Sequence, residues 1–345
     1  MPHHLLHHWD EAAIDGWERA APLPTDDPHA RIALISPPLA VAAAVAIIPS
    51  WAADTPVESW IELQLRVQQA GQWSGWYRLA AWDSAGARRT SFDAQRNEQG
   101  FVATDTLQLS TPAQAVQARV LLCGLPGADM PELTDLFLCV TTTAAPVTTP
   151  APPPRSAIAL PLLLCQYDYP GGEGWCSPTA VHMVLAYWHA QLADPRLAPF
   201  ADGATLPDLT AAGIFDPGWE GTGNWSFNTA FAARFGLRAY VTRFDTLEQI
   251  GRWTAAGVPV IISLAWEAGQ IDDAPGRTNG HLTVVRGFTD THALIAEPSG
   301  RDRLLRAYPQ DQLAAAWQAN SSGTVYLIYP PNWLRPAPGP EDAWI

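Results

Sequence analysis

The stretch Cys165-Gln-Tyr-Asp-Tyr-Pro-Gly-Gly-Glu-Gly-Trp-Cys-Ser-Pro-Thr-Ala180 decides how the C-terminal half of this chain can fold. A glycine-rich loop ends at Trp175, and the apolar run that follows predicts a buried helix over residues 177–191. Pro178 fits the first turn of that helix, where a backbone N–H has no acceptor inside the helix. Cys176 therefore lies at a helix N-terminus, where the positive end of the helix dipole favours a thiolate.

Two residues far downstream complete the pattern of a thiol nucleophile. His281 begins an apolar run over residues 281–288, and a short turn leads into a second run that ends at Glu297. Because the start of one antiparallel strand lies beside the end of the next, the hairpin can bring Glu297 alongside His281. A cysteine nucleophile needs a histidine that takes and returns its proton and a group that orients the ring, so Cys176, His281 and Glu297 predict such a site. Asp290 and Asn279 are the alternative orienting groups.

Gln166 supplies the fourth part of the pattern. It precedes Cys176 by ten residues across the glycine-rich loop, and its side-chain amide could donate to an oxyanion together with the backbone N–H of Cys176. These residues, with Gly280 before His281 and the acidic-Pro-x-Gly turn at Glu297, resemble the papain-like peptidases of cysteine peptidase family thirty-nine. That family includes the bacteriocin-processing, double-glycine peptidases and stand-alone bacterial relatives. The resemblance covers residues 155–332, about half of the chain.

The resemblance implies a papain-like α+β fold for this half. It implies that Cys176 is the nucleophile, His281 the general base and acid, and Gln166 the oxyanion donor. The family usually has Asp or Asn where this chain has Glu297, which is one methylene longer than Asp.

The predicted function is that of a cysteine peptidase that hydrolyses a peptide or protein substrate without a metal or an organic cofactor. Gly174, Trp175 and Trp225 are the predicted substrate-binding residues. Two alternatives stay open. One is acyl or peptidyl transfer by the same residues, and the other is a decayed peptidase that acts as a glycan- or peptide-binding protein.

A Pro- and Thr-rich stretch divides the chain, because such a composition cannot form a packed core. The predicted organisation is an N-terminal segment over residues 1–30 with a short helix, a β-sandwich of jelly-roll type over 31–142, a linker over 143–156, the peptidase domain over 157–335 and a tail over 336–345. Alternating apolar residues predict strands before the linker. These strands span residues 31–35, 41–48, 58–68, 75–82, 104–109, 116–123 and 133–141. After it, helices at 177–191, 227–235 and 246–256 and strands at 237–243, 258–264, 281–288, 293–297 and 325–329 predict an α+β domain.

One face of the strand at 58–68 mixes aromatic and planar polar side chains, and three further tryptophans follow it: Trp60, Glu62, Gln64, Arg66 and Gln68, then Trp73, Trp76 and Trp82. Such a face is typical of a platform for a glycan or peptide ligand, since rings stack on apolar ligand faces while amides and guanidinium groups form hydrogen bonds. The competing interpretation is a second buried layer with a few satisfied polar groups.

The formal net charge of −14, with twenty Arg and no Lys, argues against nucleic acid or an anionic membrane as a partner. The most apolar run, residues 39–48, is too short to span a bilayer, and the N-terminus lacks the pattern of a secretory signal. A cytoplasmic location follows by default and leaves export open.

The remaining cysteines and histidines carry no predicted chemistry. Four cysteines do not make a disulfide scaffold, so Cys123 and Cys139 are expected to be free thiols and Cys165 a buried strand residue. His182 and His189 share one helix face and are expected to be packing or surface residues. The histidines of the first eight residues are expected to lie in a frayed terminus.

Overall fold

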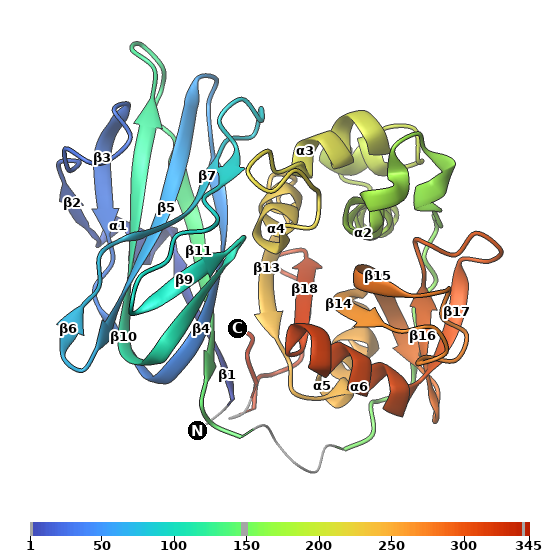
Figure 1. Ribbon diagram of the computed structural model, residues 1–345. Coiled ribbons are helices and arrows are strands. Elements are labelled where there is room, and N and C mark those ends of the chain that lie inside the picture. Colours follow the sequence, from blue (N-terminus) through green and yellow to red (C-terminus); the bar gives the residue numbers. More distant parts are fainter. Residues whose placement is uncertain (1–2, 146–150, 340–341) are drawn as a thin grey trace.

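The computed structural model describes residues 3–145, 151–339 and 342–345. An antiparallel β-rich N-terminal domain lies beside a mixed C-terminal domain in which helices and a second antiparallel sheet form separate layers (Figure 1). The α+β fold class predicted from the order of the elements is therefore confirmed.

The N-terminal domain is one strongly curved antiparallel sheet. Its elements are β1 (His4–Asp10), α1 (Glu11–Asp15), β2 (Glu18–Ala20), β3 (Ala30–Ile35), β4 (Leu39–Asp54), β5 (Ser59–Gln69), β6 (Gln72–Trp73), β7 (Tyr77–Trp82), β8 (Thr90–Ser91), β9 (Gly100–Ala103), β10 (Thr106–Gly124) and β11 (Glu132–Thr142). The first part of β10 pairs with β9 and its second part with β3 and β5, while β4 pairs with both parts. The two runs predicted at 104–109 and 116–123 are thus one long strand.

The C-terminal domain places its helices before most of its strands. Its elements are β12 (Ser156–Ala157), the short helical turns η1 (Gln166–Asp168) and η2 (Gly172–Gly174), α2 (Cys176–Leu192), η3 (Pro195–Phe200), η4 (Leu206–Ala211), α3 (Ala212–Ile214), α4 (Trp225–Ala233), β13 (Arg238–Arg243), α5 (Leu247–Ala255), β14 (Val260–Trp266), β15 (Thr278–Phe288), β16 (His292–Ala296), β17 (Leu305–Pro309), α6 (Gln310–Ser321) and β18 (Thr324–Tyr329). The sheet runs in the order β13-β18-β14-β15-β16-β17, and β12 pairs with β15.

The two domains share one continuous apolar core. Phe227 of α4 contacts the rings of Trp51 and Trp82 from the N-terminal domain, with centroid distances of 6.1 and 5.2 Å. Phe137 stacks on Tyr240 at 4.7 Å. These rings are almost completely buried, so the domains are packed together as tightly as elements of one domain.

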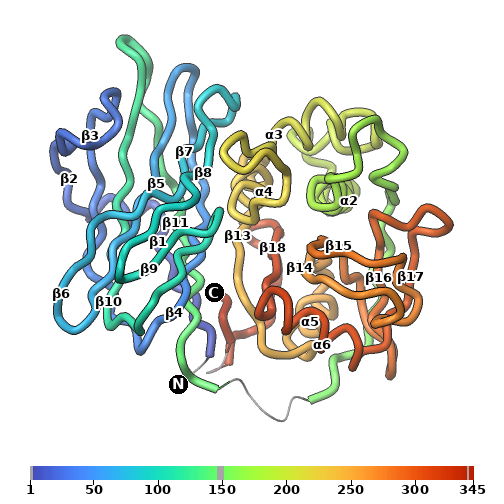
Figure 2. The backbone as a smooth tube through the Cα atoms, viewed as in Figure 1, coloured from blue at the N-terminus to red at the C-terminus, as the bar shows by residue number. Residues whose placement is uncertain are grey.

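Both ends of the chain lie against this seam. The first histidines, expected to lie in a frayed terminus, instead belong largely to β1, which pairs with β11 along its whole length and buries His4 and Trp9. His3 and His4 contact Asp245 of the other domain, and the three side chains bring potential metal-ligand atoms within 4.8 Å of one another. At the other end, Trp344 packs against Trp253, and the C-terminal residues return to the seam (Figure 2).

The predicted linker lies only partly within the described residues, because residues 146–150 fall outside them. Its last residue, Ser156, already belongs to β12. Pro153 and Pro154 lie so close to Gly251 of α5 that a Cβ there would collide with them. The domain boundaries themselves stay a proposal.

The first part of the mixed face of β5 is closed. Trp60, Glu62 and Gln64 are at most 2% exposed, and the carboxylate of Glu62 accepts two hydrogen bonds of 2.7 Å from Arg78. Arg119 pairs with Asp26 beside them. This part of the face is therefore a second buried layer, and no ligand can reach it.

All four cysteines are free thiols, as expected. Cys165 is buried but precedes η1 in an irregular segment instead of a strand. His182 is fully buried, with its ring between Thr210 and the carbonyl of Asp202. Among the described residues, no helix is both long enough and apolar enough to cross a membrane.

The shared core predicts that the two domains unfold together. Phe227→Ala removes a ring that is fully buried between them, so we expect a loss of about 3–5 kcal/mol in the free energy of unfolding. Calorimetry should show one cooperative transition, shifted to lower temperature. Leu334→Ala, at a side chain that is 86% exposed, is the control and should change stability by less than about 0.5 kcal/mol. Two separate transitions, with only one of them moved, would contradict the shared core.

Candidate active site

Cys176 is the first residue of α2, as the sequence predicts, and the loop before it is fixed by a close backbone approach. Gly172 lies so near the carbonyl of Gln166 that any Cβ would collide with it, which explains the glycine. The backbone then turns through η2 into α2, so the Cys176 thiol stands at the positive end of a 17-residue helix.

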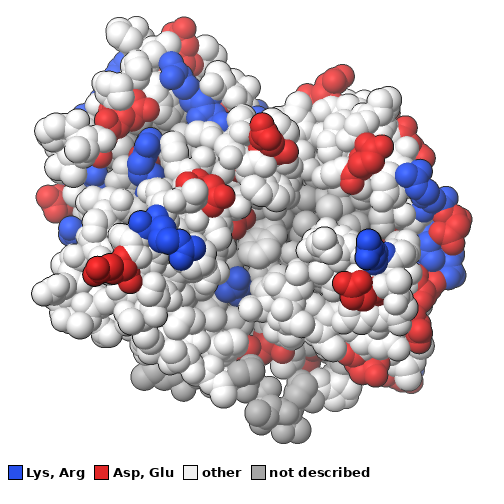
Figure 3. Space-filling model, viewed as in Figure 1, with Lys and Arg blue, Asp and Glu red and all other residues white. Residues whose placement is uncertain are grey.

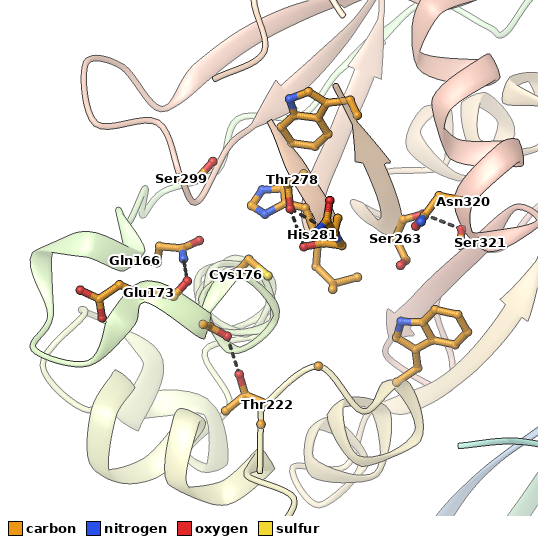
Figure 4. Close-up of a pocket in the computed structure, with 18 of the residues that line it drawn as sticks. Gln166, Glu173, Cys176, Thr222, Ser263, Thr278, His281, Ser299, Asn320 and Ser321 are labelled. Atoms are coloured by element: carbon orange, nitrogen blue, oxygen red, sulfur yellow. Dashed lines mark hydrogen bonds between the residues drawn. The ribbon is translucent and has the colours of Figure 1, made fainter. Parts of the chain in front are cut away.

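His281 faces Cys176 from the opposite wall of a cleft (Figure 4). It lies on β15, and both it and the next residue, Leu282, line the cleft together with Cys176. The cleft has a volume of about 1120 Å³ and opens between the helices, the C-terminal sheet and the N-terminal domain.

Glu297 holds the other side of the His281 ring. Its Oε1 lies 2.5 Å from His281 Nε2, which leaves Nδ1 as the nitrogen that serves Cys176. The carboxylate is completely buried and is itself held by Ser299, through the backbone N–H at 2.9 Å and the hydroxyl at 2.7 Å, and by the Tyr308 hydroxyl at 2.9 Å. The extra methylene of glutamate is therefore accommodated without loss of contact. Asp290, an alternative orienting group, pairs instead with Arg155 at the surface.

The charges of these groups support one another. Burial alone would raise the pKa of the Cys176 thiol, but His281, through its charge and hydrogen bond, and the N–H of Leu282 hold it below its ordinary value. Burial would lower the pKa of His281, whereas the Glu297 carboxylate and the Cys176 thiolate raise it and prevail. Burial opposes the charge of Glu297, yet His281 and Ser299 lower its pKa to about 2. The site thus favours a thiolate beside an imidazolium at neutral pH.

Gln166 is near this pair but its donors are in use. It lines the cleft with Cys176, and its Nε2 donates to the carbonyls of Gly172 and Glu173, both at 2.9 Å. Its Oε1 is buried with no hydrogen-bond partner among the described residues. The amide therefore anchors the loop before Cys176 in this state, and it would have to turn to reach an oxyanion.

Only two of the three predicted substrate-binding residues are among those that line the cleft. Gly174 and Trp225 line the cleft, whereas Trp175 is half-buried and packs against the apolar core. Three further residues escaped the sequence analysis. Ser299 and Tyr308 hold Glu297, and Trp266 stands perpendicular to the His281 ring at 5.2 Å, where it covers the His281–Glu297 contact. Ser299 could have been found from its place two residues after Glu297, but Tyr308 depends on the pairing of β16 with β17.

Family models match both halves of the chain. Residues 162–325 match the Peptidase_C39 like family, and residues 21–139 match the Peptidase C39 N-terminal domain. The C-terminal domain therefore belongs to the C39-like peptidase family. The family named from the sequence motifs is thereby confirmed, and the C39-like domain contains Gln166, Cys176, His281 and Glu297.

Solved structures show weaker similarity. The crystal structure of a "putative C39-like peptidase" from Bacillus anthracis has 17% sequence identity and a TM-score of 0.35, and the match covers 50% of this chain and 96% of that one. A chain from infectious bursal disease virus, Gx strain, has 6% identity and a TM-score of 0.23, and covers 41% of this chain and 34% of that one. No curated protein matches the chain.

The pair of His281 and Glu297 predicts how activity depends on pH. Glu297→Gln keeps the length of the side chain but removes its charge, so the pKa of His281 falls and the imidazolium is lost at lower pH. We expect the alkaline limb of the kcat/KM profile against pH to move to lower pH. Glu297→Asp, the matched variant, keeps the charge but shortens the reach, so it should lower kcat with a smaller displacement of that limb. Superimposable profiles of the wild type and Glu297→Gln would show that Glu297 does not control the ring.

Proposed function

We propose that this protein is a cysteine peptidase in which Cys176 attacks the carbonyl carbon of a peptide bond. The observation that supports it best is the position of the Cys176 thiol opposite the His281 ring, which is itself bonded to the buried Glu297 carboxylate, inside a cleft large enough for a peptide. Membership of the C39-like family supports the same reaction class.

The reaction follows the positions of these groups. The Cys176 thiolate forms a bond to the carbonyl carbon, and the negative charge moves to the carbonyl oxygen. The backbone N–H of Cys176, free of an acceptor within the first turn of α2, is the nearest donor for that oxygen. The imidazolium of His281 gives its Nδ1 proton to the leaving amine as the C–N bond breaks, which leaves a thioester on Cys176.

Water completes the cycle. Neutral His281 removes a proton from water, and the resulting hydroxide adds to the thioester carbon. The C–S bond then breaks, which releases the acid product and restores the Cys176 thiolate. Glu297 keeps the ring in place throughout, since its Oε1 accepts from Nε2. If an amine of another peptide replaced water, the same residues would transfer the acyl group, so the products of a reaction with and without added amine separate hydrolysis from transfer.

The nucleophile is tested by replacing single cysteines. Cys176→Ala should reduce hydrolysis of a peptide mixture to the background rate, while Cys123→Ala, in the N-terminal domain, should retain activity. Cys176 should also react with iodoacetamide faster than the buried Cys165, because its thiolate is favoured at neutral pH. Equal labelling of the two cysteines, together with full activity of Cys176→Ala, would refute the proposal.

Gln166 requires a test that separates two roles. If Gln166 is an oxyanion donor, Gln166→Ala should lower kcat by about 10²–10³-fold with KM little changed. If Gln166 only anchors the loop, Gln166→Ala should lower thermal stability and raise KM, because the loop carries Gly174 of the cleft wall. We expect both effects, since the amide is bonded to the loop in the structure. An unchanged kcat would remove Gln166 from the reaction.

A further inference from the structure

The N-terminal domain forms part of the wall of the active-site cleft. The turn between β9 and β10, residues 103–106, and the nearby Gln108 line the same cleft as Cys176 and His281. In Figure 1 this turn points from the N-terminal domain toward α4 and β13, and Figure 3 shows the surface hollowed between the two domains. The site is therefore not contained in the C39-like domain alone.

The cleft has two ends. Gln166 and Arg301 line the cleft, and Gln166 lies on the opposite side of Cys176 from Ser321 (Figure 4). The second end is the part lined by Trp225 and Arg243, both of which are bonded to the N-terminal domain. Between the ends, helices form one wall and the C-terminal sheet forms the other, with Cys176 and His281 facing each other across the middle (Figure 4).

At the second end the N-terminal domain is bonded to the helical wall. The Asp105 carboxylate accepts from the backbone N–H of Trp225 at 2.6 Å, at the N-terminus of α4, and the Ser226 hydroxyl donates to the carbonyl of Pro49 at 2.6 Å. The Ser226 contact is buried, and the Asp105 contact is partly buried. The turn thus meets the helices at Trp225, which lines the cleft.

The same domain is also bonded to the sheet wall. The backbone N–H of Val241 donates to the Ser50 hydroxyl at 3.1 Å, and Arg243 Nη1 donates to the Thr141 hydroxyl at 2.7 Å. A body that is bonded to both walls on one side limits how far the walls can move apart there.

These contacts of the N-terminal domain lie close to Cys176. A chain of short contacts connects them: Asp105 to the N–H of Trp225, the neighbouring Asn224 carbonyl to Asn228 at 2.8 Å, and Asn228 to the hydroxyl of Ser177 at 2.8 Å. Ser177 follows Cys176 directly. Since an extended peptide advances about 3.3 Å per residue, the distance from the scissile bond to this end sets how many substrate residues fit between them.

Charged groups at this end suit a chain terminus. Arg243 is 6% exposed, and two of its nitrogens donate to Thr141 and Thr324. Among the described residues, no acceptor is bonded to its third nitrogen. Asp105 supplies a carboxylate on the other side of the same end. A terminal carboxylate or ammonium group that enters here finds an opposite charge, whereas the middle of a long chain finds no exit.

We propose that the N-terminal domain closes one end of the cleft, so that the peptidase acts near a chain terminus and not in the middle of a long chain. This inference rests on the proposed function. It assigns to the β9–β10 turn the role of setting how many residues are accepted on one side of the scissile bond.

The test is a set of synthetic peptides around one cleaved sequence, lengthened by single residues on the amino side or on the carboxyl side. We expect kcat/KM to fall at least about tenfold once one series exceeds a few residues, while the other series is tolerated. Acetylation or amidation of the limited terminus shows which terminus is bound. Equal cleavage of both series at every length would overturn this inference alone. No cleavage of any peptide, with wild type equal to Cys176→Ala, would overturn it together with the proposed function.

Variants of the turn make the test specific. Ala103→Phe adds bulk at the closed end and should shorten the accepted length by about one residue, whereas Ala12→Phe, on the exposed face of α1, should leave the limit unchanged. Thr104 has a φ of 55°, so Thr104→Gly removes a side chain from the turn without backbone strain and should relax the limit. If both turn variants fold, as their melting temperatures will show, and neither moves the limit, the turn does not set it.

Discussion

The contact between His281 and Glu297 is the constraint on which the site depends. It joins two strands of the C-terminal sheet inside the protein, and it can form only if β15 and β16 pair in the observed register. A shift of one residue in this pairing would turn Glu297 away from His281. The buried carboxylate is tolerated because Ser299 also donates to Oε1, and Tyr308 donates to Oε2, which His281 does not reach.

The local patterns of the sequence were sufficient for much of this arrangement. Pro178 and the apolar run after Cys176 placed the start of α2, and strict alternation placed β5, because both signals depend on neighbours along the chain. The hairpin between residues 281 and 297 predicted the contact of Glu297 with His281, because that signal also depends on neighbours along the chain. The strand β1 and the helix α6 were not predicted, because segments distant in the sequence determine which of their side chains are buried.

The sequence did not reveal what depends on two domains at once. Asp105 and Trp225 are 120 positions apart, and no periodicity links them. The mixed face of β5 has the composition of a binding surface, yet Asp26 and Arg119 cover the part around Gln64, and only the folded chain shows that cover. Gln166 was identified by its spacing from Cys176, but the direction of its amide depends on the loop carbonyls that it meets.

The rings that join the domains also bear on how the protein could be divided. Phe227 and Tyr240 belong to the C39-like domain, and both are covered by aromatic side chains of the N-terminal domain. Cutting the chain between the domains would expose these faces to water as a contiguous apolar patch, which favours aggregation. The N-terminal domain therefore serves its neighbour as an intramolecular cover, and the smallest stable unit that carries the site is the pair.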